Sequence, residues 1–155
     1  MATVLIETIK ANQEETEQQA KIVLLRAIVH LQAGWIQGDY AQTADGRPTN
    51  PLAAEATAWC VDGACMLAQH ETGASREAMR LVQKALTLTC SARKGTKIEP
   101  FRWANEVNDL PGITRFYMIA ILRHAAEVVP RAHLVQGGTY PPGWAKKILK
   151  QAQEG

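Results

Sequence analysis

Two neighbouring apolar stripes run along a helical stretch between residues 14 and 33. Ile22, Leu25 and Val29 form one stripe, and Leu24, Ile28 and Leu31 form the other. Apolar residues at this spacing share one side of a helix, so two adjoining stripes predict a broad buried face. Gly34 stands where this helix is expected to end. The apolar residues within positions 3–12 either form a separate short helix or extend this one.

Helical spacing returns after a polar interruption and continues almost to the end of the chain. Further helices are predicted over residues 52–70, 76–90, 101–107, 114–130 and 143–153. Asn50 followed by Pro51 matches a helix N-cap and the first helical position. Ser75 and Thr114 are expected to cap later helices. Pro130 is expected to end its helix, because proline lacks the amide hydrogen that the helix needs.

The interruption between residues 34 and 51 is long, polar and punctuated by glycine. Asp45-Gly46 is a tight-turn signal, and the flanking segments 40–43 and 47–49 predict at most a vestigial β-hairpin. Gly63, inside the predicted 52–70 helix, costs about 1 kcal/mol relative to alanine. That cost predicts the close approach of another backbone or of a ligand.

The composition is that of one globular domain, which we place over residues 1–155. The chain has 155 residues, of which 46% are hydrophobic and 21% charged, and alanine is abundant. This favours helix over sheet and is long enough to bury a core. We therefore predict an all-α fold, a compact bundle of four to five helices with one long ordered loop.

Charge and cysteine content limit the partners and the cellular location that we expect for the protein. A net charge of +2 is too small to predict nucleic-acid binding. No apolar run approaches the roughly 18 residues of a membrane span, and no secretion signal is evident. Three irregularly spaced cysteines argue against a disulfide framework. A reduced, cytoplasmic location is expected, and a homo-oligomer is compatible with these features.

Metal and nucleophile chemistry have weak signals. Cys60 and Cys65 are five residues apart on a predicted helix and point about 140° apart, so they do not share a metal ion easily. The chain has no nucleophile elbow and no phosphate-binding glycine loop. No metal, cofactor or catalytic residue is predicted. A Cys–His pair formed in space is an open alternative.

Three aspartates indicate an alternative function, that of a small hydrolase. Asp39, Asp62 and Asp109 lie in or near loops, and acid chemistry requires at least two of them, or one with a histidine, to converge in a pocket. We expect Asp62 to be exposed beside Gly63. The other interpretation is a buried, paired carboxylate with a perturbed pKa.

Aromatic and basic residues point to the leading hypothesis, a non-enzymatic binding protein. Between residues 76 and 102 there are seven basic residues against two acidic ones. Aromatic rings stack on bases, and arginine binds phosphate. We predict a small anionic, nucleotide-like ligand bound by Trp35, Gln37, Tyr40, Arg47, Trp59, Asn108, Asp109 and Arg115. The alternative for each residue is that it pins the loop to the bundle.

Four ordered motifs resemble a family of short actinobacterial and phage proteins that is classed only as a domain of unknown function. The motifs are Gly34-Trp35-x-Gln37-Gly38-x-Tyr40, Asp45-Gly46-Arg47-Pro48, Trp59-Cys60-x-x-Gly63-Ala64 and Asn108-Asp109-x-Pro111-Gly112. The resemblance covers roughly Ile22 to Val129. Asp62 and Val107 depart from it, since a neutral residue and a tryptophan are expected there.

The resemblance implies no established activity. It does imply that the loop, the Trp59-Cys60 segment and the Asn108-Asp109 turn form one assembly. It also makes a phage origin plausible, and by analogy small phage proteins block host defences. A second function hypothesis is therefore a protein-interaction module that inhibits a bacterial defence protein, using the basic segment 76–84 or the tail.

Overall fold

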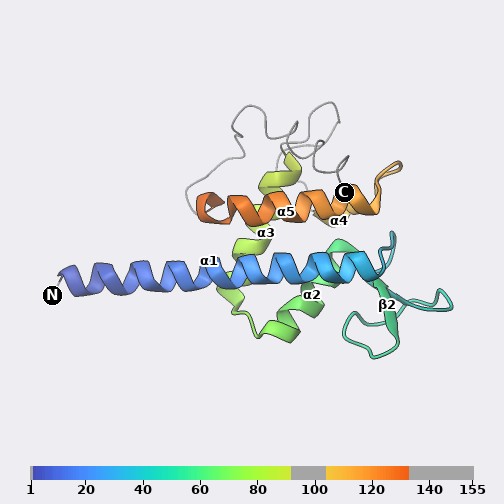
Figure 1. Cartoon of the computed structure of the whole chain (residues 1–155), viewed down its shortest axis with the longest axis horizontal. Coiled ribbons are helices and arrows are strands. Elements are labelled where there is room, and N and C mark those ends of the chain that lie inside the picture. The colour runs from blue at the N-terminus through green and yellow to red at the C-terminus, as the bar shows by residue number, and fades with distance from the viewer. Residues whose placement is uncertain (1, 92–103, 133–155) are drawn as a thin grey trace.

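The structure is a computed structural model that describes residues 2–91 and 104–132. Its elements are α1 (Ala2–Ala33), β1 (Ala41–Thr43), β2 (Ala56–Trp59), α2 (Val61–Thr72), α3 (Arg76–Ser91), α4 (Ala104–Asn108) and α5 (Arg115–Ala132). The predicted helical bundle is confirmed, with a two-stranded sheet added to it (Figure 1). The basic segment 92–100, the start of the predicted 101–107 helix and the predicted 143–153 helix lie outside the described residues.

The core lies where α1 meets α2, α3 and α5, and where α3 crosses α5 (Figure 1). Its largest fully buried side chains include Leu24 and Leu31 of α1, Leu86 of α3, and Met118 and Leu122 of α5. Burying each such side chain contributes roughly 1.5–3 kcal/mol. Positions 3–12 extend α1 rather than forming a separate helix.

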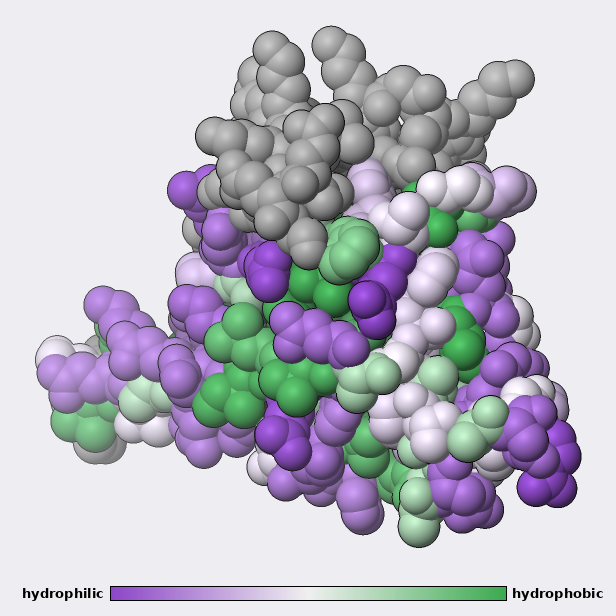
Figure 2. Space-filling model, turned by 45° about the vertical axis from the view of Figure 1, so that its right-hand side comes forward, coloured by the Kyte–Doolittle hydropathy of each residue, from purple (hydrophilic) through white to green (hydrophobic). Residues whose placement is uncertain are grey.

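The prediction that both stripes of α1 are buried is wrong for one of them. Leu24, Ile28 and Leu31 are buried, whereas Ile22, Leu25 and Val29 are 42–50% exposed. The neighbouring helices pack against the first stripe, and no described element covers the second. Figure 2 shows apolar side chains gathered on this exposed stretch of α1.

The predicted start of the second helix is also wrong. Residues 56–59 form β2, which pairs antiparallel with β1, and α2 begins at Val61. Asn50 does act as a cap, since its Oδ1 accepts a hydrogen bond from the amide of Leu52 at 2.8 Å. The turn that it starts is not continued, because Trp59 pairs with the backbone of Gly34 and Ile36 instead. Cys60 is the true N-cap of α2.

The turn signal in the loop is correct, and the predicted vestigial hairpin is confirmed beside a separate two-stranded sheet. The amide of Thr43 donates a hydrogen bond to the carbonyl of Arg47 at 2.9 Å, and Gln42 and Pro48 form an isolated bridge. Gly46 has φ +83°, which suits glycine at this turn. The strand that pairs fully with β1 is β2.

Two predicted caps are confirmed, and one predicted helix end is not. The hydroxyl oxygens of Ser75 and Thr114 each accept a first-turn amide hydrogen bond at 3.1 Å, from Ala78 and Tyr117 respectively. Pro130, however, lies inside α5, which continues to Ala132. Two helical residues follow the proline within the described part of the chain, and its missing amide costs one backbone hydrogen bond.

Candidate functional site

The side chain of Asn108 ties three segments of the chain together. Its Oδ1 accepts hydrogen bonds from Trp35 Nε1 at 2.8 Å and from the amide of Val61 at 3.1 Å. Its Nδ2 donates to the carbonyl of Ile36 and to Asp109 Oδ1, each at 3.0 Å. Asn108 is fully buried and uses all four hydrogen-bonding positions of its amide. It therefore has no capacity left for a ligand.

Gln37 and Asp109 complete this connection. Gln37 Nε2 donates to the carbonyls of Asn108 at 2.8 Å and Leu110 at 3.0 Å, and Asp109 Oδ1 accepts from the amide of Gly38 at 3.0 Å. We call Trp35, Gln37, Asn108 and Asp109 the clasp. Four of the eight predicted site residues thus lie together, and they join the loop to the turn after α4.

Gly63 confirms the predicted close approach, and its neighbour is backbone. A Cβ atom at this position would lie 2.0 Å from the carbonyl oxygen of Tyr40. The same oxygen accepts a hydrogen bond from the amide of Cys60 at 3.2 Å. The side chain of Tyr40 is exposed, so its backbone is fixed while its ring faces solvent.

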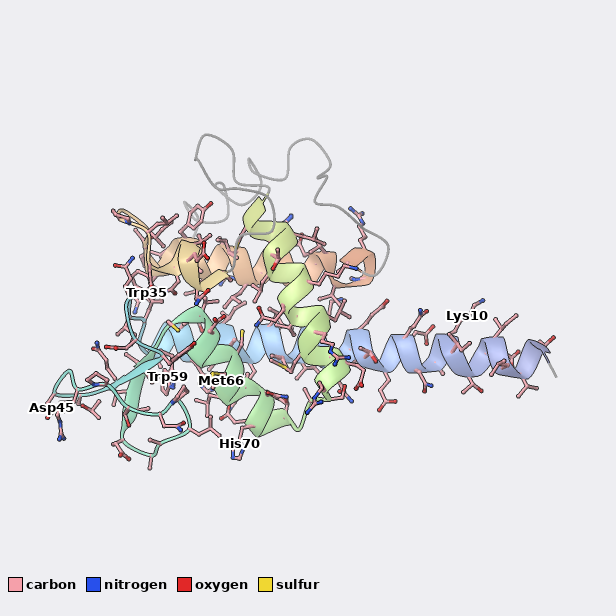
Figure 3. All side chains as sticks on the ribbon, turned by 180° about the vertical axis from the view of Figure 1, so that it is seen from behind. Lys10, Trp35, Asp45, Trp59, Met66 and His70 are labelled. Atoms are coloured by element: carbon pink, nitrogen blue, oxygen red, sulfur yellow. The ribbon has the colours of Figure 1, made fainter. Side chains whose placement is uncertain are left out.

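The side chains of two other predicted site residues lie outside the clasp, although the backbone of Trp59 pairs with the chain on both sides of Trp35. Trp59 is buried, its Nε1 donates to the carbonyl of Pro51 at 3.0 Å, and its ring lies 5.3 Å from that of His30. Arg47 is exposed and pairs with Asp45 at 2.9 Å. Figure 3 shows Asp45 at the tip of the loop, far from Trp35. Trp59 belongs to the core, and Arg47 to the loop tip.

An aspartate pocket of about 370 Å³ opens beside the clasp. It is lined by Gly38, Asp39, Tyr40, Cys60, Asn105 and Asp109. Asp39 Oδ2 accepts a hydrogen bond from Gln42 Nε2 at 2.9 Å. Two of the three candidate acids therefore converge, as the hydrolase alternative requires.

Asp62 lies beside this pocket, half-buried rather than exposed as expected. Its Oδ1 is buried and has no hydrogen-bond partner in the described part of the chain. Burial raises the pKa of this carboxyl, and the negative charge of Asp109 raises it further. The structure supports the perturbed pKa of the other interpretation but not its pairing, because Oδ1 has no partner within the described residues.

The neighbouring thiols are poor nucleophiles. Burial, with smaller contributions from the charges of Asp62 and Asp109, raises the pKa of Cys60 to about 11. Burial also raises the pKa of Cys65. Both thiols are therefore protonated at neutral pH. His30 contacts Glu71 and the Trp59 ring rather than either thiol.

A second hollow, open to solvent and of about 430 Å³, lies beside Trp35. It is lined by Trp35, Ile113, Thr114, Arg115 and Phe116, and we call it the arginine cavity. The Arg115 guanidinium lies 5.3 Å from the centre of the Phe116 ring. Within residues 2–91 and 104–132 it has no carboxylate partner. The structure thus brings two predicted residues, Trp35 and Arg115, to one cavity.

Sequence reasoning missed Phe116 and Arg123 at this place. Gln32, Arg115, Phe116, Ile119 and Arg123 line an adjoining hollow of about 190 Å³. Arg115, Ile119 and Arg123 are spaced by four residues, which puts them on one face of a helix. That spacing was a usable signal for a second arginine.

The described part of the chain contains neither a candidate metal site nor a candidate membrane span. Across the two described ranges, no three His, Cys, Asp or Glu side chains are arranged to hold a metal ion. In the same ranges, no helix has the length and apolar character needed to cross a membrane.

The model of a family of unknown function, DUF6197, matches residues 15–128. The chain belongs to this family. The DUF6197 match includes the clasp, the aspartate pocket and the arginine cavity. It leaves out the first turns of α1. No curated protein and no solved structure matches the chain.

Proposed function

We propose that this DUF6197 protein is a non-enzymatic binding protein that captures a small anion carrying an aromatic ring, of the nucleotide kind, in the arginine cavity. The observation that carries the proposal is that Trp35 and Arg115, distant in sequence and on different segments, line the same cavity. Its volume of about 430 Å³ is in the range of small-molecule sites.

The lining supplies the chemistry that such a ligand needs. Stacking on an aromatic ring is worth roughly 1–3 kcal/mol per base. Arg115 offers a planar set of donors to a phosphate, and Arg123 in the adjoining hollow adds a second positive charge. The amino end of α5, which begins at Arg115, contributes the partial positive charge of a helix N-terminus.

The clasp gives Trp35 a fixed orientation in this proposal. The hydrogen bond from its Nε1 to the buried Asn108 holds the indole plane before any ligand arrives. Preorganised contacts lower the entropy cost of binding. Asn108, Gln37 and Asp109 therefore act as positioning residues, whereas Tyr40, Arg47 and Trp59 lie outside the cavity lining.

Calorimetry against a panel of nucleotides and cyclic nucleotides tests the proposal. Arg115→Ala is expected to weaken binding about tenfold or more, because it removes a charge-assisted contact. Arg76→Ala, which removes an exposed arginine from α3, is the matched control and is expected to bind normally. If no member of the panel gives heat with the wild-type protein, the proposal is abandoned.

Capture of a nucleotide signal would suit a phage protein that blocks a host defence system. This extension rests on the family resemblance and on analogy. It is tested by asking whether the protein protects phage growth in a host whose defence uses a nucleotide signal. Protection should be lost in Arg115→Ala. Protection that persists in this variant would point to a protein partner instead.

We keep hydrolysis as a second candidate, because Asp39 and Asp109 line one pocket with Asp62 beside it. A carboxyl with a raised pKa can donate a proton while a neighbouring carboxylate accepts one. Turnover of ester or phosphodiester substrates that is lost in Asp39→Asn, with stability unchanged, would support it. Absence of turnover across both substrate classes would remove it.

A further inference from the structure

The amino-terminal part of α1 projects beyond the other helices (Figures 1 and 3). We call residues 2–15 the projecting segment. Residues 3–15 are all exposed, and the exposed fractions of Val4, Leu5, Ile6 and Ile9 are 50–66%. A helix of this length is marginal in water unless an apolar face is covered, and β-branched residues such as Ile6 and Ile9 weaken it further. The segment therefore has the character of an interface.

The apolar residues of the projecting segment continue the core-facing side of α1. Ile6, Ile9, Gln13, Thr16, Ala20, Val23 and Ala27 follow one another at alternating spacings of three and four residues. This is the spacing of a seam along which helices pack. From Ala20 onward the seam is buried by the other helices. Before Thr16 it is uncovered, and Ile6 and Ile9 are its apolar members there.

A groove lies beside the base of the projecting segment. It has a volume of about 410 Å³ and is lined by Ile9, Asn12, Gln13 and Thr16 of α1 and by Glu77, Arg80, Leu81 and Lys84 of α3. Ile9 and Leu81 supply apolar surface. Arg80 and Lys84 have no carboxylate partner in residues 2–91 and 104–132. We call this the α3 groove, and its α3 side has two bases and one acid.

The charge of the projecting segment is opposite to that of the α3 side of the groove. The segment has three glutamates, Glu7, Glu14 and Glu15, against one lysine, Lys10. An acidic apolar helix and a basic apolar groove thus lie next to each other on the same chain. Complementary charge guides association and fixes its register.

We propose that the projecting segment occupies the α3 groove of a second copy of this chain, whose own segment occupies the first groove in return. A twofold axis near Ile9 would lay the two segments antiparallel, with the Ile9 side chains of both copies in contact. Such an exchange closes on itself, as most soluble dimers do. It also covers the uncovered seam with apolar surface, and brings Glu7 of one copy toward Arg80 and Lys84 of the other.

The exposed stripe of Ile22, Leu25 and Val29 serves as a matched control surface. It is apolar and lies on α1, but on a different face from Ile6 and Ile9. Leu25→Glu places a charge on that stripe just as Ile9→Glu places one on the seam. Comparing the two variants distinguishes a specific interface from nonspecific hydrophobic association.

Sedimentation equilibrium of the full chain tests the dimer. The wild type is expected to be dimeric at about 100 µM, and Ile6→Glu with Ile9→Glu is expected to weaken association about 100-fold or more. Both side chains are exposed in the single copy, so circular dichroism should show that the bundle remains folded. Leu25→Glu is expected to associate like the wild type.

Charge exchange adds a second arm to the experiment. Arg80→Glu with Lys84→Glu should also give monomers, and adding Glu7→Lys should restore part of the association. A wild type that stays monomeric would overturn the proposal. This holds even if hydrogen exchange shows that other parts of the same chain protect the segment. A dimer that survives the Ile6 and Ile9 changes but not Leu25→Glu would also overturn it.

Discussion

The aspartate pocket and the arginine cavity border the same clasp and differ in charge. Asp109 of the clasp faces the first, with Asp39 nearby, whereas Trp35 faces the second, with Arg115. Both are held by hydrogen bonds to one buried amide, that of Asn108. The conformation of the loop and the chemistry of each cavity therefore have separate causes. A change in the clasp should damage both cavities, and a change in one lining should leave the other intact.

The largest effect is expected from Asn108→Ala. It leaves the Trp35 indole nitrogen, the Val61 amide and the Ile36 carbonyl without their partner, and each lost buried hydrogen bond costs about 1–3 kcal/mol. We expect a loss of about 3–5 kcal/mol, measured by urea unfolding. Asn105→Ala, in the lining of the aspartate pocket, is the control and should cost less than about 1 kcal/mol. Equal losses in the two variants would contradict the role of the clasp.

Gly63→Ala is expected to damage the aspartate pocket selectively. The new Cβ would meet the Tyr40 carbonyl oxygen at 2.0 Å, and this contact is backbone that cannot rotate away. Displacing that backbone should cost about 2 kcal/mol or more. Thermal unfolding measures the cost, and nucleotide calorimetry should show the arginine cavity unchanged. A Gly63→Ala variant as stable as the wild type would show that the approach is looser than described.

Asp62→Asn is expected to stabilise the protein at neutral pH by about 1 kcal/mol, because it removes a partly buried charge without a partner. The pKa of Asp62 is raised in the folded state, so the cost of its charge is present above that pKa. The advantage of the variant should shrink as pH falls through the folded pKa. It should vanish below the pKa of the unfolded chain. Urea unfolding at several pH values measures this, and a gap that grows on acidification would contradict it.

The smallest effect is expected from Arg47→Ala. Its side chain is exposed and its partner Asp45 is also accessible, so the pair contributes less than about 0.5 kcal/mol. Binding of nucleotides should also stay unchanged, because Arg47 lines neither cavity. A tenfold loss of affinity in this variant would move the site toward the loop tip, where the sequence placed part of it.

Local chemistry explains which parts of the fold were predictable. Ser75 and Thr114 are recognisable as caps because a hydroxyl satisfies a nearby amide whatever the surroundings. The close approach at Gly63 is recognisable because glycine inside a helix is costly unless something needs the space. The assembly of the loop with the Asn108-Asp109 turn follows from the ordered motifs, and the structure shows those segments joined by hydrogen bonds.

Residues 52–60 show where local signals are insufficient. Asn50 and Pro51 start a turn as a helix cap would, yet the chain turns into β2 because β1 and the Gly34 segment offer backbone partners on both sides. A sheet pairing between distant segments has no local periodicity to reveal it. The spacing of Cys60 predicts a place on a helix face, whereas the structure makes it the cap.

The sequence pattern was sufficient for most of the described helices, for the caps Ser75 and Thr114, for the turn at Gly46 and for the residue types available at a site. Tertiary packing places Ile22, Leu25 and Val29 outside the core, because burial depends on which helices pack against α1. Packing also directs all four hydrogen-bonding positions of the Asn108 amide to other groups of the protein. It likewise brings Arg115, rather than Arg47, to the cavity that Trp35 lines. Periodicity identifies the face that a helix can bury, whereas packing decides which faces and side chains meet.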